Sequence, residues 1–160
     1  MMQWRADSAD ATQGMAAALA PLLFPGAMLA LVGDLGAGKT TFAQGLCRAL
    51  EVSESVASPT FVLLRVYRGR LPVYHFDAYR LDTPRELDDL GAEEYFWGDG
   101  VTLLEWADRV PDALPADLLR ITFEIVSEDA RHLNFEASGP KHAALLENYV
   151  AALGGRKPHG

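Results

Sequence analysis

Hydrophobic and polar residues follow two different periods along the chain, one typical of helices and the other of strands. Apolar residues that recur every three or four positions predict helices; these segments are 12–23, 42–50, 84–95 and 141–153. Short apolar runs predict strands; these are 28–32, 61–67, 72–76, 101–104, 119–126 and 132–137. We expect Asp10 or Thr12 to cap the first helix, and Pro25-Gly26 to separate it from the first strand.

The order of these elements predicts an α/β fold. Strands that alternate with helices favour a mostly parallel sheet with helices on both faces. Strands 61–67 and 72–76 flank the short connection Arg68-Gly69-Arg70 and are typical of an antiparallel hairpin, so we expect a mixed sheet. The chain has 160 residues, of which 49% are apolar. It is therefore expected to form one domain over residues 1–153, followed by a flexible tail over 154–160.

Residues 33–40 read Gly-Asp-Leu-Gly-Ala-Gly-Lys-Thr, a complete G-x-x-x-x-G-K-[ST] phosphate-binding loop. Its glycines permit the backbone to bend so that N–H groups face phosphate oxygens. In this motif Lys39 reaches the β- and γ-phosphates, and the hydroxyl of Thr40 binds Mg²⁺. The motif requires a strand before it and a helix after it, and both are predicted here. The sequence thus indicates a P-loop NTPase-like fold with the nucleotide at the carboxyl end of the first predicted strand.

Hydrolysis needs a carboxylate near the metal and a group that positions water, in addition to the phosphate loop. Asp77 follows the apolar run 73–76, and Glu105 follows the run 101–104. Both carboxylates are therefore expected at strand tips, where either could reach Mg²⁺ directly or through water. Spacing alone does not assign the two roles, and an ordinary surface acid is the alternative for each.

Four more residues near these motifs have a functional and a structural interpretation. Ser58 and Thr60 lie between a predicted helix and a predicted strand, where nucleotide-sensing switches occur; a proline-rigidified turn with capping hydroxyls is the alternative. His75 is interpreted as a strand residue rather than a base or a ligand, because no second histidine lies at metal-binding spacing. Trp106 is expected to line the site, face a partner or pack in the core.

The charge and composition bear on nucleic-acid binding, on the role of the cysteine and on the cellular compartment. The net charge of −8 at pH 7 argues against direct binding to a nucleic-acid backbone. The single cysteine, Cys47, has apolar neighbours and is expected to be a buried, inert thiol. We find no signal peptide, and the apolar stretch from Met15 to Phe24 is too short to span a bilayer. A cytoplasmic protein without membrane association is expected.

ATP is favoured over GTP because the guanine-reading run Asn-Lys-x-Asp is missing. Neither Asn134 nor Asn148 is followed by lysine. The run Asp88-Asp89-Leu90-Gly91 matches the short Asp-x-x-Gly pattern of GTPases, but it falls in a predicted helix rather than after a strand.

Four segments in this order resemble the TsaE (YjeE-type) family, the ATPases of bacterial tRNA threonylcarbamoyladenosine biosynthesis. The segments are residues 33–41, Ser58-Pro59-Thr60-Phe61, His75-Phe76-Asp77-Ala78-Tyr79-Arg80-Leu81 and Leu104-Glu105-Trp106, with Gly91 to Phe96 between the last two. The likeness extends from about Thr12 to Gly139. Ala78 departs from the family pattern, where a larger residue is common, and is not expected to disturb Asp77.

The resemblance implies an ATPase that uses ATP and Mg²⁺ and acts with TsaD-type and TsaB-type proteins, which modify the adenosine beside the anticodon. Contact with tRNA is then expected only through that complex. The implied magnesium ligands are Thr40 and Glu105, with Lys39 as a phosphate contact and Asp77 as a water-positioning or more distant carboxylate. The other implied nucleotide contacts are Thr12 near the base, Arg131, Gly33, Asp34, Leu35, Gly36, Ala37, Gly38 and Thr41, with Ser58 and Thr60 as the switch.

Hydrolysis by the isolated chain is expected to be slow and stimulated by partners, because no arginine is identifiable as a transition-state finger. Arg80 is the best internal candidate, and a structural salt bridge is its alternative role. Two rival functions remain open. One is a small-molecule kinase, although the acidic segment after Arg80 does not suit a phosphate-covering lid. The other is an interaction switch that needs ATP binding without essential hydrolysis.

Overall fold

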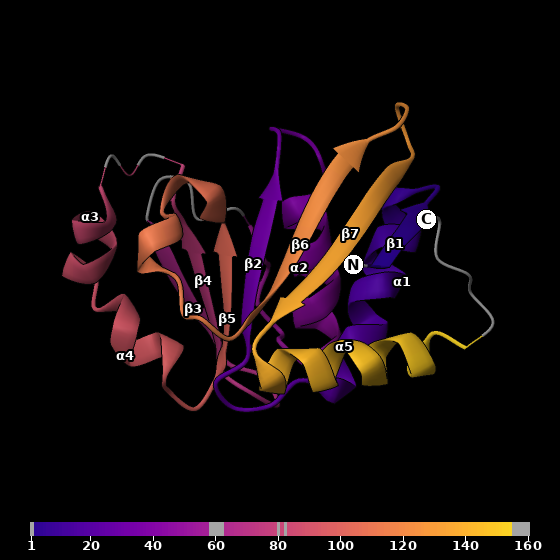
Figure 1. Ribbon diagram of the computed structural model, residues 1–160. Helices are drawn as coiled ribbons and strands as arrows, with labels where there is room; N and C mark the ends of the chain where they lie inside the picture. Colours follow the sequence, from indigo (N-terminus) through magenta and orange to yellow (C-terminus); the bar gives the residue numbers. More distant parts are fainter. Residues whose placement is uncertain (1, 58–62, 80, 82, 155–160) are drawn as a thin grey trace.

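In the computed structural model, residues 2–57, 63–79, 81 and 83–154 are described. Within them, seven strands form one sheet in the order β1-β7-β6-β2-β5-β4-β3 (Figure 1). The strands are β1 (Met2–Ala6), β2 (Met28–Gly33), β3 (Leu64–Tyr67), β4 (Val73–Asp77), β5 (Val101–Glu105), β6 (Leu118–Ile125) and β7 (Arg131–Ser138). The central strands β6, β2, β5 and β4 are parallel, whereas β3, β7 and β1 join by antiparallel pairing. The predicted mixed sheet and the antiparallel hairpin of β3 and β4 are confirmed.

Helices cover both faces of the sheet, as expected (Figure 1). Helices α1, α2 and α5 pack on one face, and the short helices α3 and α4 pack on the other. The helical segments are α1 (Ala9–Leu19), η1 (Ala20–Leu22), α2 (Lys39–Ala49), α3 (Pro84–Asp89), α4 (Ala92–Phe96), η2 (Ala107–Arg109), η3 (Pro111–Ala113) and α5 (Pro140–Ala152). No helix in these ranges combines the length and the apolar character that crossing a bilayer requires.

The central strand β2 divides the core into two halves. Leu29 and Leu31 point toward α1 and α2, whereas Met28 and Ala30 point toward the face covered by α3 and α4. Because successive side chains of a strand face opposite sides, a strand covered on both faces must be apolar throughout. This requirement explains the uninterrupted apolar run that identified β2 in the sequence.

Three features of the fold differ from the sequence predictions. Strand β1 was not expected; it pairs with β7, far along the chain. The first helix starts earlier than predicted, because Ser8 rather than Asp10 or Thr12 is the N-cap and its hydroxyl accepts a hydrogen bond from the N–H of Ala11 at 3.0 Å. The single helix predicted over 84–95 is two helices, because Gly91 has a φ of 75° and breaks the helical path.

Two of the predicted segments lie partly outside the described residues. These are the beginning of the strand predicted at 61–67 and the tail predicted at 154–160, of which only Gly154 is described. Cys47 is fully buried on α2, and burial raises the pKa of its thiol to about 12. An inert thiol agrees with this environment.

Helix α5 is fastened to the sheet through a buried histidine. The Nε2 atom of His142 accepts a hydrogen bond from the N–H of Met28 at 2.9 Å, and its Nδ1 lies 2.7 Å from a carboxylate oxygen of Asp117. Desolvation alone would raise the pKa of Asp117, but hydrogen bonds from His142 and Lys141 hold this pKa below its ordinary value. The start of α5 is thereby tied to the start of β2.

Helices α1 and α2 approach closely at Gly45. A Cβ atom at this position would lie 2.7 Å from both the Cα and the carbonyl oxygen of Gln13 on α1. Real Cβ atoms do not come so near to backbone atoms, so α2 must carry glycine here. This packing fixes the position of the helix that follows the phosphate loop.

We expect Gly45→Ala to lower the free energy of unfolding by ~1–3 kcal/mol, because the added methyl group overpacks the contact between the two helices. Gly14→Ala on α1 is the matched control, since nothing lies within 4 Å of a Cβ at that position. The control should raise stability by up to ~1 kcal/mol through helix propensity. Urea denaturation of both variants measures the difference; equal stabilities would contradict the close approach.

Candidate nucleotide site

The phosphate loop joins the end of β2 to the start of α2. The N-cap of α2 is Gly38, with a φ of 110°, which only glycine adopts without strain. The loop is closed by a hydrogen bond from the N–H of Ala37 to the carbonyl oxygen of Asp34 at 3.0 Å. The first N–H groups of α2 have no partner within the helix and carry the positive end of its dipole. The backbone of this loop therefore has the geometry that suits an anion.

The ammonium group of Lys39 lies against this loop. Its Nζ atom donates hydrogen bonds to the carbonyl oxygens of Gly33 and Asp34, the second at 3.0 Å. It also lies 3.9 Å from the centroid of the Trp106 ring. Burial lowers the pKa of Lys39, while the negative charges of Glu105 and other carboxylates act to raise it. The cation is therefore already beside the position where phosphate oxygens are expected.

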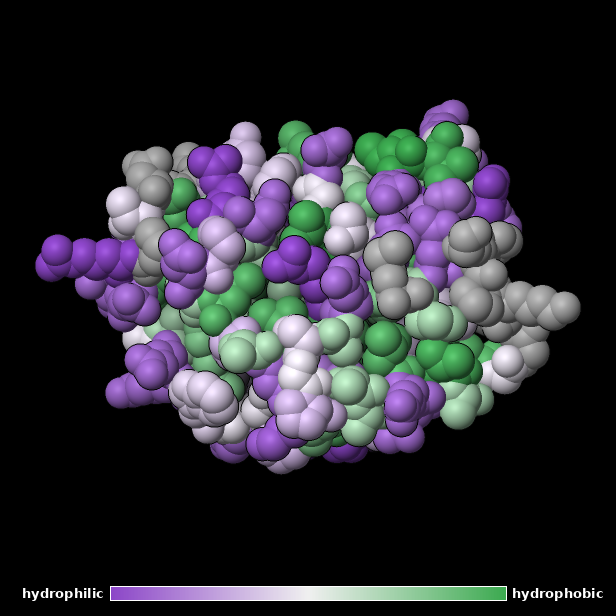
Figure 2. All heavy atoms as spheres, in the orientation of Figure 1, coloured by the Kyte–Doolittle hydropathy of each residue, from purple (hydrophilic) through white to green (hydrophobic). Residues whose placement is uncertain are grey.

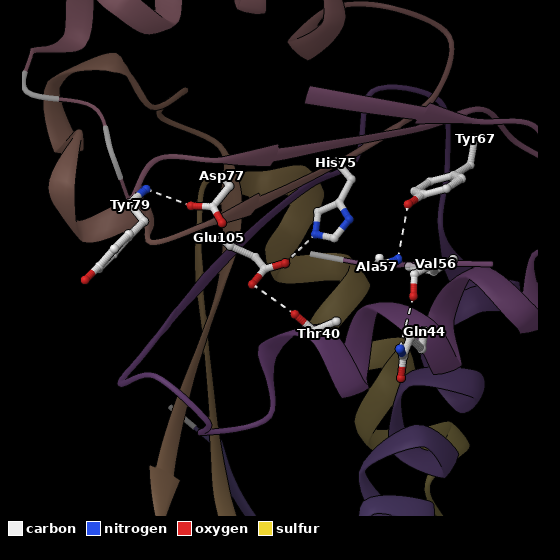
Figure 3. Close-up of polar contacts among 9 residues, drawn as sticks. All are labelled: Thr40, Gln44, Val56, Ala57, Tyr67, His75, Asp77, Tyr79 and Glu105. Atoms are coloured by element: carbon white, nitrogen blue, oxygen red, sulfur yellow. Dashed lines mark hydrogen bonds and ion pairs between the residues drawn. The ribbon is translucent and has the colours of Figure 1, made fainter. Parts of the chain in front are cut away.

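Two buried carboxylates lie at the ends of neighbouring parallel strands. Asp77 of β4 and Glu105 of β5 are direct partners in the strand register, and each residue is 2% exposed. An oxygen of Glu105 lies 3.5 Å from the hydroxyl of Thr40 on α2 (Figure 3). An oxygen of Asp77 instead accepts a hydrogen bond from the N–H of Tyr79 at 2.7 Å. Glu105 is thus the carboxylate that lies beside Thr40.

The pair formed by Thr40 and Glu105 fits a magnesium ion. Mg²⁺ prefers hard oxygen ligands and usually takes one or two protein ligands, with waters and substrate phosphates completing its shell. A hydroxyl and a carboxylate that converge beside a phosphate loop provide this set. The family resemblance implied these two residues as the metal ligands, and that assignment stays a prediction.

Two adjoining hollows lie over the phosphate loop, and we call them together the groove. A hollow of about 260 Å³ is lined by Leu35, Gly36, Gly38, Lys39, Thr40, Thr41, Glu105 and Trp106. A second hollow of about 110 Å³ is lined by Ala9, Thr12, Gly36, Gly38, Thr41, Glu128, Asp129 and Arg131. Gly36, Gly38 and Thr41 line both hollows, so the two adjoin over the loop and the first turn of α2. One end holds the lysine and Glu105, and the other holds Thr12 and Arg131.

Arg131 belongs to the second end of the groove. Its guanidinium donates to the carbonyl oxygen of Gly36 at 3.2 Å, and also to the carbonyl oxygens of Ser127, Glu128 and Ala130. The side chain therefore ties the turn between β6 and β7 to the phosphate loop. The structure thus brings Thr12 and Arg131, which are far apart in the sequence, together at the loop.

Of the remaining residues singled out in the sequence, some are described by the structure and others are not. Ser58, Thr60 and Arg80 lie outside the described residues. Trp106 lines the groove and packs against the ring of Tyr79, with 4.8 Å between centroids. His75 is a strand residue of β4, as interpreted, but its Nε2 atom lies 2.5 Å from an oxygen of Glu105. The sequence analysis missed this contact, although the alternation of His75 and Asp77 on one face of a strand hinted at it.

Comparison with known proteins gives consistent results. The family model described as "Threonylcarbamoyl adenosine biosynthesis protein TsaE" matches residues 6–133. A protein named tRNA threonylcarbamoyladenosine biosynthesis protein TsaE from Bacillus subtilis (strain 168) is 41% identical over 147 residues, which cover 91% of this chain and 92% of that protein. A protein of the same name from Treponema pallidum (strain Nichols) is 40% identical over 126 residues, covering 79% of this chain and 93% of that protein.

A solved structure is also similar over nearly the whole chain. The crystal structure of YdiB from Bacillus subtilis superposes with a TM-score of 0.83 at 36% sequence identity, and the match covers 94% of each chain. The likeness therefore extends over nearly the whole fold.

We expect Arg131→Ala to weaken ATP binding about tenfold, because one hydrogen bond to a charged group is worth ~1.5 kcal/mol and its loss frees the turn from the loop. Arg120→Ala is the matched control, because Arg120 is exposed on β6 and its substitution removes the same charge. Calorimetric titration with ATP compares the two variants. Equal affinities would show that the second end of the groove does not belong to the nucleotide site.

Proposed function

The chain belongs to the family of threonylcarbamoyl adenosine biosynthesis proteins TsaE, and from this premise we propose that it binds and hydrolyses ATP in support of that tRNA modification. The observation that carries the proposal is the groove in which a phosphate loop, Lys39, Thr40 and Glu105 converge. Each of these groups suits one part of a magnesium–nucleotide complex.

The proposed binding follows from the positions of these groups. Backbone N–H groups of the loop hold the phosphates, and Lys39 exchanges its hydrogen bonds to loop carbonyls for bonds to phosphate oxygens. Thr40 and Glu105 would hold Mg²⁺, and the ion would neutralise charge on the phosphates. Asp77, oriented by the N–H of Tyr79, lies next to Glu105 and is the group we assign to the attacking water. We assign the base to the other end of the groove, which Thr12 and Arg131 line.

The proposed partners are TsaD-type and TsaB-type proteins, with tRNA contacted through them. The net charge of −8 supports this arrangement, because an acidic chain repels the tRNA backbone. Figure 2 shows apolar side chains gathered at the upper right, over the end of β6 and the start of β7. Exposed apolar residues near the groove are Leu35, Ile125 and Val126, which are 79%, 53% and 40% exposed. Such residues suit contact with another protein.

Partner stimulation has a structural rationale. Among the described residues, those that line the phosphate end of the groove include no arginine. An arginine that reaches the transferring phosphoryl group accelerates hydrolysis strongly in related chemistry. We therefore propose slow turnover by the isolated chain and faster turnover in the complex. Since ATP and tRNA meet in the cytoplasm, we place the chain there.

We expect the pure chain to hydrolyse ATP well below ~10 per second, the median rate of enzymes, and a TsaB–TsaD pair to raise the rate at least about tenfold. Lys39→Ala should abolish the stimulated rate and weaken ATP binding by about 10–100-fold, because it removes a buried charged hydrogen-bond donor. Lys141→Ala, at an exposed position on α5, is the control. A phosphate-release assay measures the hydrolysis rate of all three proteins, and calorimetric titration measures their affinity for ATP.

Two outcomes would contradict this proposal. Activity that is indifferent to the pair, together with a phosphorylated metabolite, would favour the small-molecule kinase. Repeated rounds of tRNA modification with an Asp77→Asn variant that binds but does not hydrolyse ATP would favour the switch that needs binding alone.

A further inference from the structure

The carboxylate of Glu105 is contacted on both sides. One oxygen, Oε1, lies 3.5 Å from the hydroxyl of Thr40, and the other, Oε2, lies 2.5 Å from Nε2 of His75 (Figure 3). His75 is fully buried in β4. The two oxygens thus face different neighbours, one toward the phosphate loop and one toward the interior of the sheet.

The strand register explains why His75 reaches Glu105. His75 and Asp77 lie two residues apart on β4 and share one face of the sheet. The register pairs Asp77 with Glu105, so His75 lies one pleat below that pair on the neighbouring strand. A side chain as long as histidine spans this diagonal distance. Both strands are parallel and central, so the contact is fixed by the fold rather than by a loop.

The imidazole ring is held from its other side as well. The ring of Tyr67 on β3 packs beside it, with 6.5 Å between centroids. The Tyr67 hydroxyl accepts a hydrogen bond from the N–H of Ala57 at 3.4 Å, and Gln44 of α2 donates to the carbonyl oxygen of Val56 at 3.0 Å (Figure 3). The hydroxyl of the ring that packs beside His75 is thus itself hydrogen-bonded.

The hydrogen-bond pattern assigns a proton to Nε2. Among the described residues, Nδ1 of His75 is buried without a partner. A buried donor left unpaired is costly. The neutral tautomer with hydrogen on Nε2 leaves only an acceptor at Nδ1 and directs the single N–H at Glu105. A ring nitrogen that donates to a carboxylate is a common way to orient that carboxylate.

We propose that His75 is a positioning residue for Glu105. By donating to Oε2, it holds the carboxylate so that Oε1 stays turned toward Thr40, in the orientation that suits Mg²⁺. The inference rests on the proposed function and assigns no direct contact between His75 and the nucleotide. It differs from the simpler role of filling space in the core, because only the donor at Nε2 matters for the orientation.

The test compares His75→Leu, which fills space without a donor, with His75→Gln, which places an N–H near the position of Nε2. The measured quantity is the Mg²⁺ concentration that gives half-maximal binding of a fluorescent ATP analogue, with binding in EDTA and the melting temperature recorded alongside. We expect His75→Leu to keep binding in EDTA and to need at least about tenfold more Mg²⁺. The Mg²⁺ requirement of His75→Gln should stay within about threefold of that of the original chain. This change is small beside the ~10–100-fold loss of metal affinity that follows when such a hydrogen-bond partner is removed.

Val73→Ala is the matched control, because Val73 is buried on the same face of β4 and packs in the core away from Glu105. It should lower the melting temperature without changing the Mg²⁺ requirement. The inference is overturned if His75→Leu keeps the original requirement, if His75→Leu and His75→Gln shift it alike, or if Val73→Ala shifts it as much. Should His75→Leu not fold, His75→Asn replaces it, since its shorter side chain places the N–H too far from Glu105; equal requirements for the asparagine and glutamine variants then overturn the inference.

Lys39→Ala separates this inference from the proposed function. If that variant binds the analogue with Mg²⁺ as well as the original chain does, the proposed nucleotide site itself fails. If Lys39→Ala loses binding while His75→Leu behaves like the original chain, only the role of His75 is refuted.

Discussion

The parallel register of β2, β5 and β4 determines where each polar group of the site lies. In a parallel sheet the carboxyl ends of neighbouring strands meet at one edge. Here β2 runs into the phosphate loop, and its Leu31 pairs with Glu105, which in turn pairs with Asp77. A shift of one residue in this register would turn both acids to the opposite face of the sheet. The apolar residues that pack on both faces fix the register and so fix the site.

The charged groups of the site are buried, which is energetically costly unless each has a partner. The side chains of Lys39, Asp77 and Glu105 are at most 5% exposed, and a buried charge is tolerated only when it is paired or hydrogen-bonded. Each charge has neighbouring hydrogen-bond partners. Lys39 donates to carbonyl oxygens of the loop, and Asp77 accepts from the N–H of Tyr79. Thr40 and His75 contact the two oxygens of Glu105. The same partners that stabilise the charges also orient them, so stability and the proposed chemistry depend on one set of hydrogen bonds.

Local patterns predicted much of this arrangement. The loop at 33–40 and the acids that end two apolar runs were recognisable because each depends on neighbouring residues alone. The role of Glu105 beside Thr40 and its contact with His75 were not derivable from spacing, because they depend on the register of two strands distant in the chain. Strand β1 was missed for the same reason, since its pairing with β7 is non-local. The family resemblance implied Thr12 and Arg131 as nucleotide contacts, but no sequence pattern predicted that they line the same hollow.

A crystal structure with Mg²⁺ and a non-hydrolysable ATP analogue tests the central claim most directly. The account predicts phosphates against the N–H groups of residues 33–40, the metal between the oxygens of Thr40 and Glu105, and the base between Thr12 and Arg131. Glu105 should keep its contact with His75 in that complex. A nucleotide bound elsewhere, or a metal held without Glu105, would contradict the account.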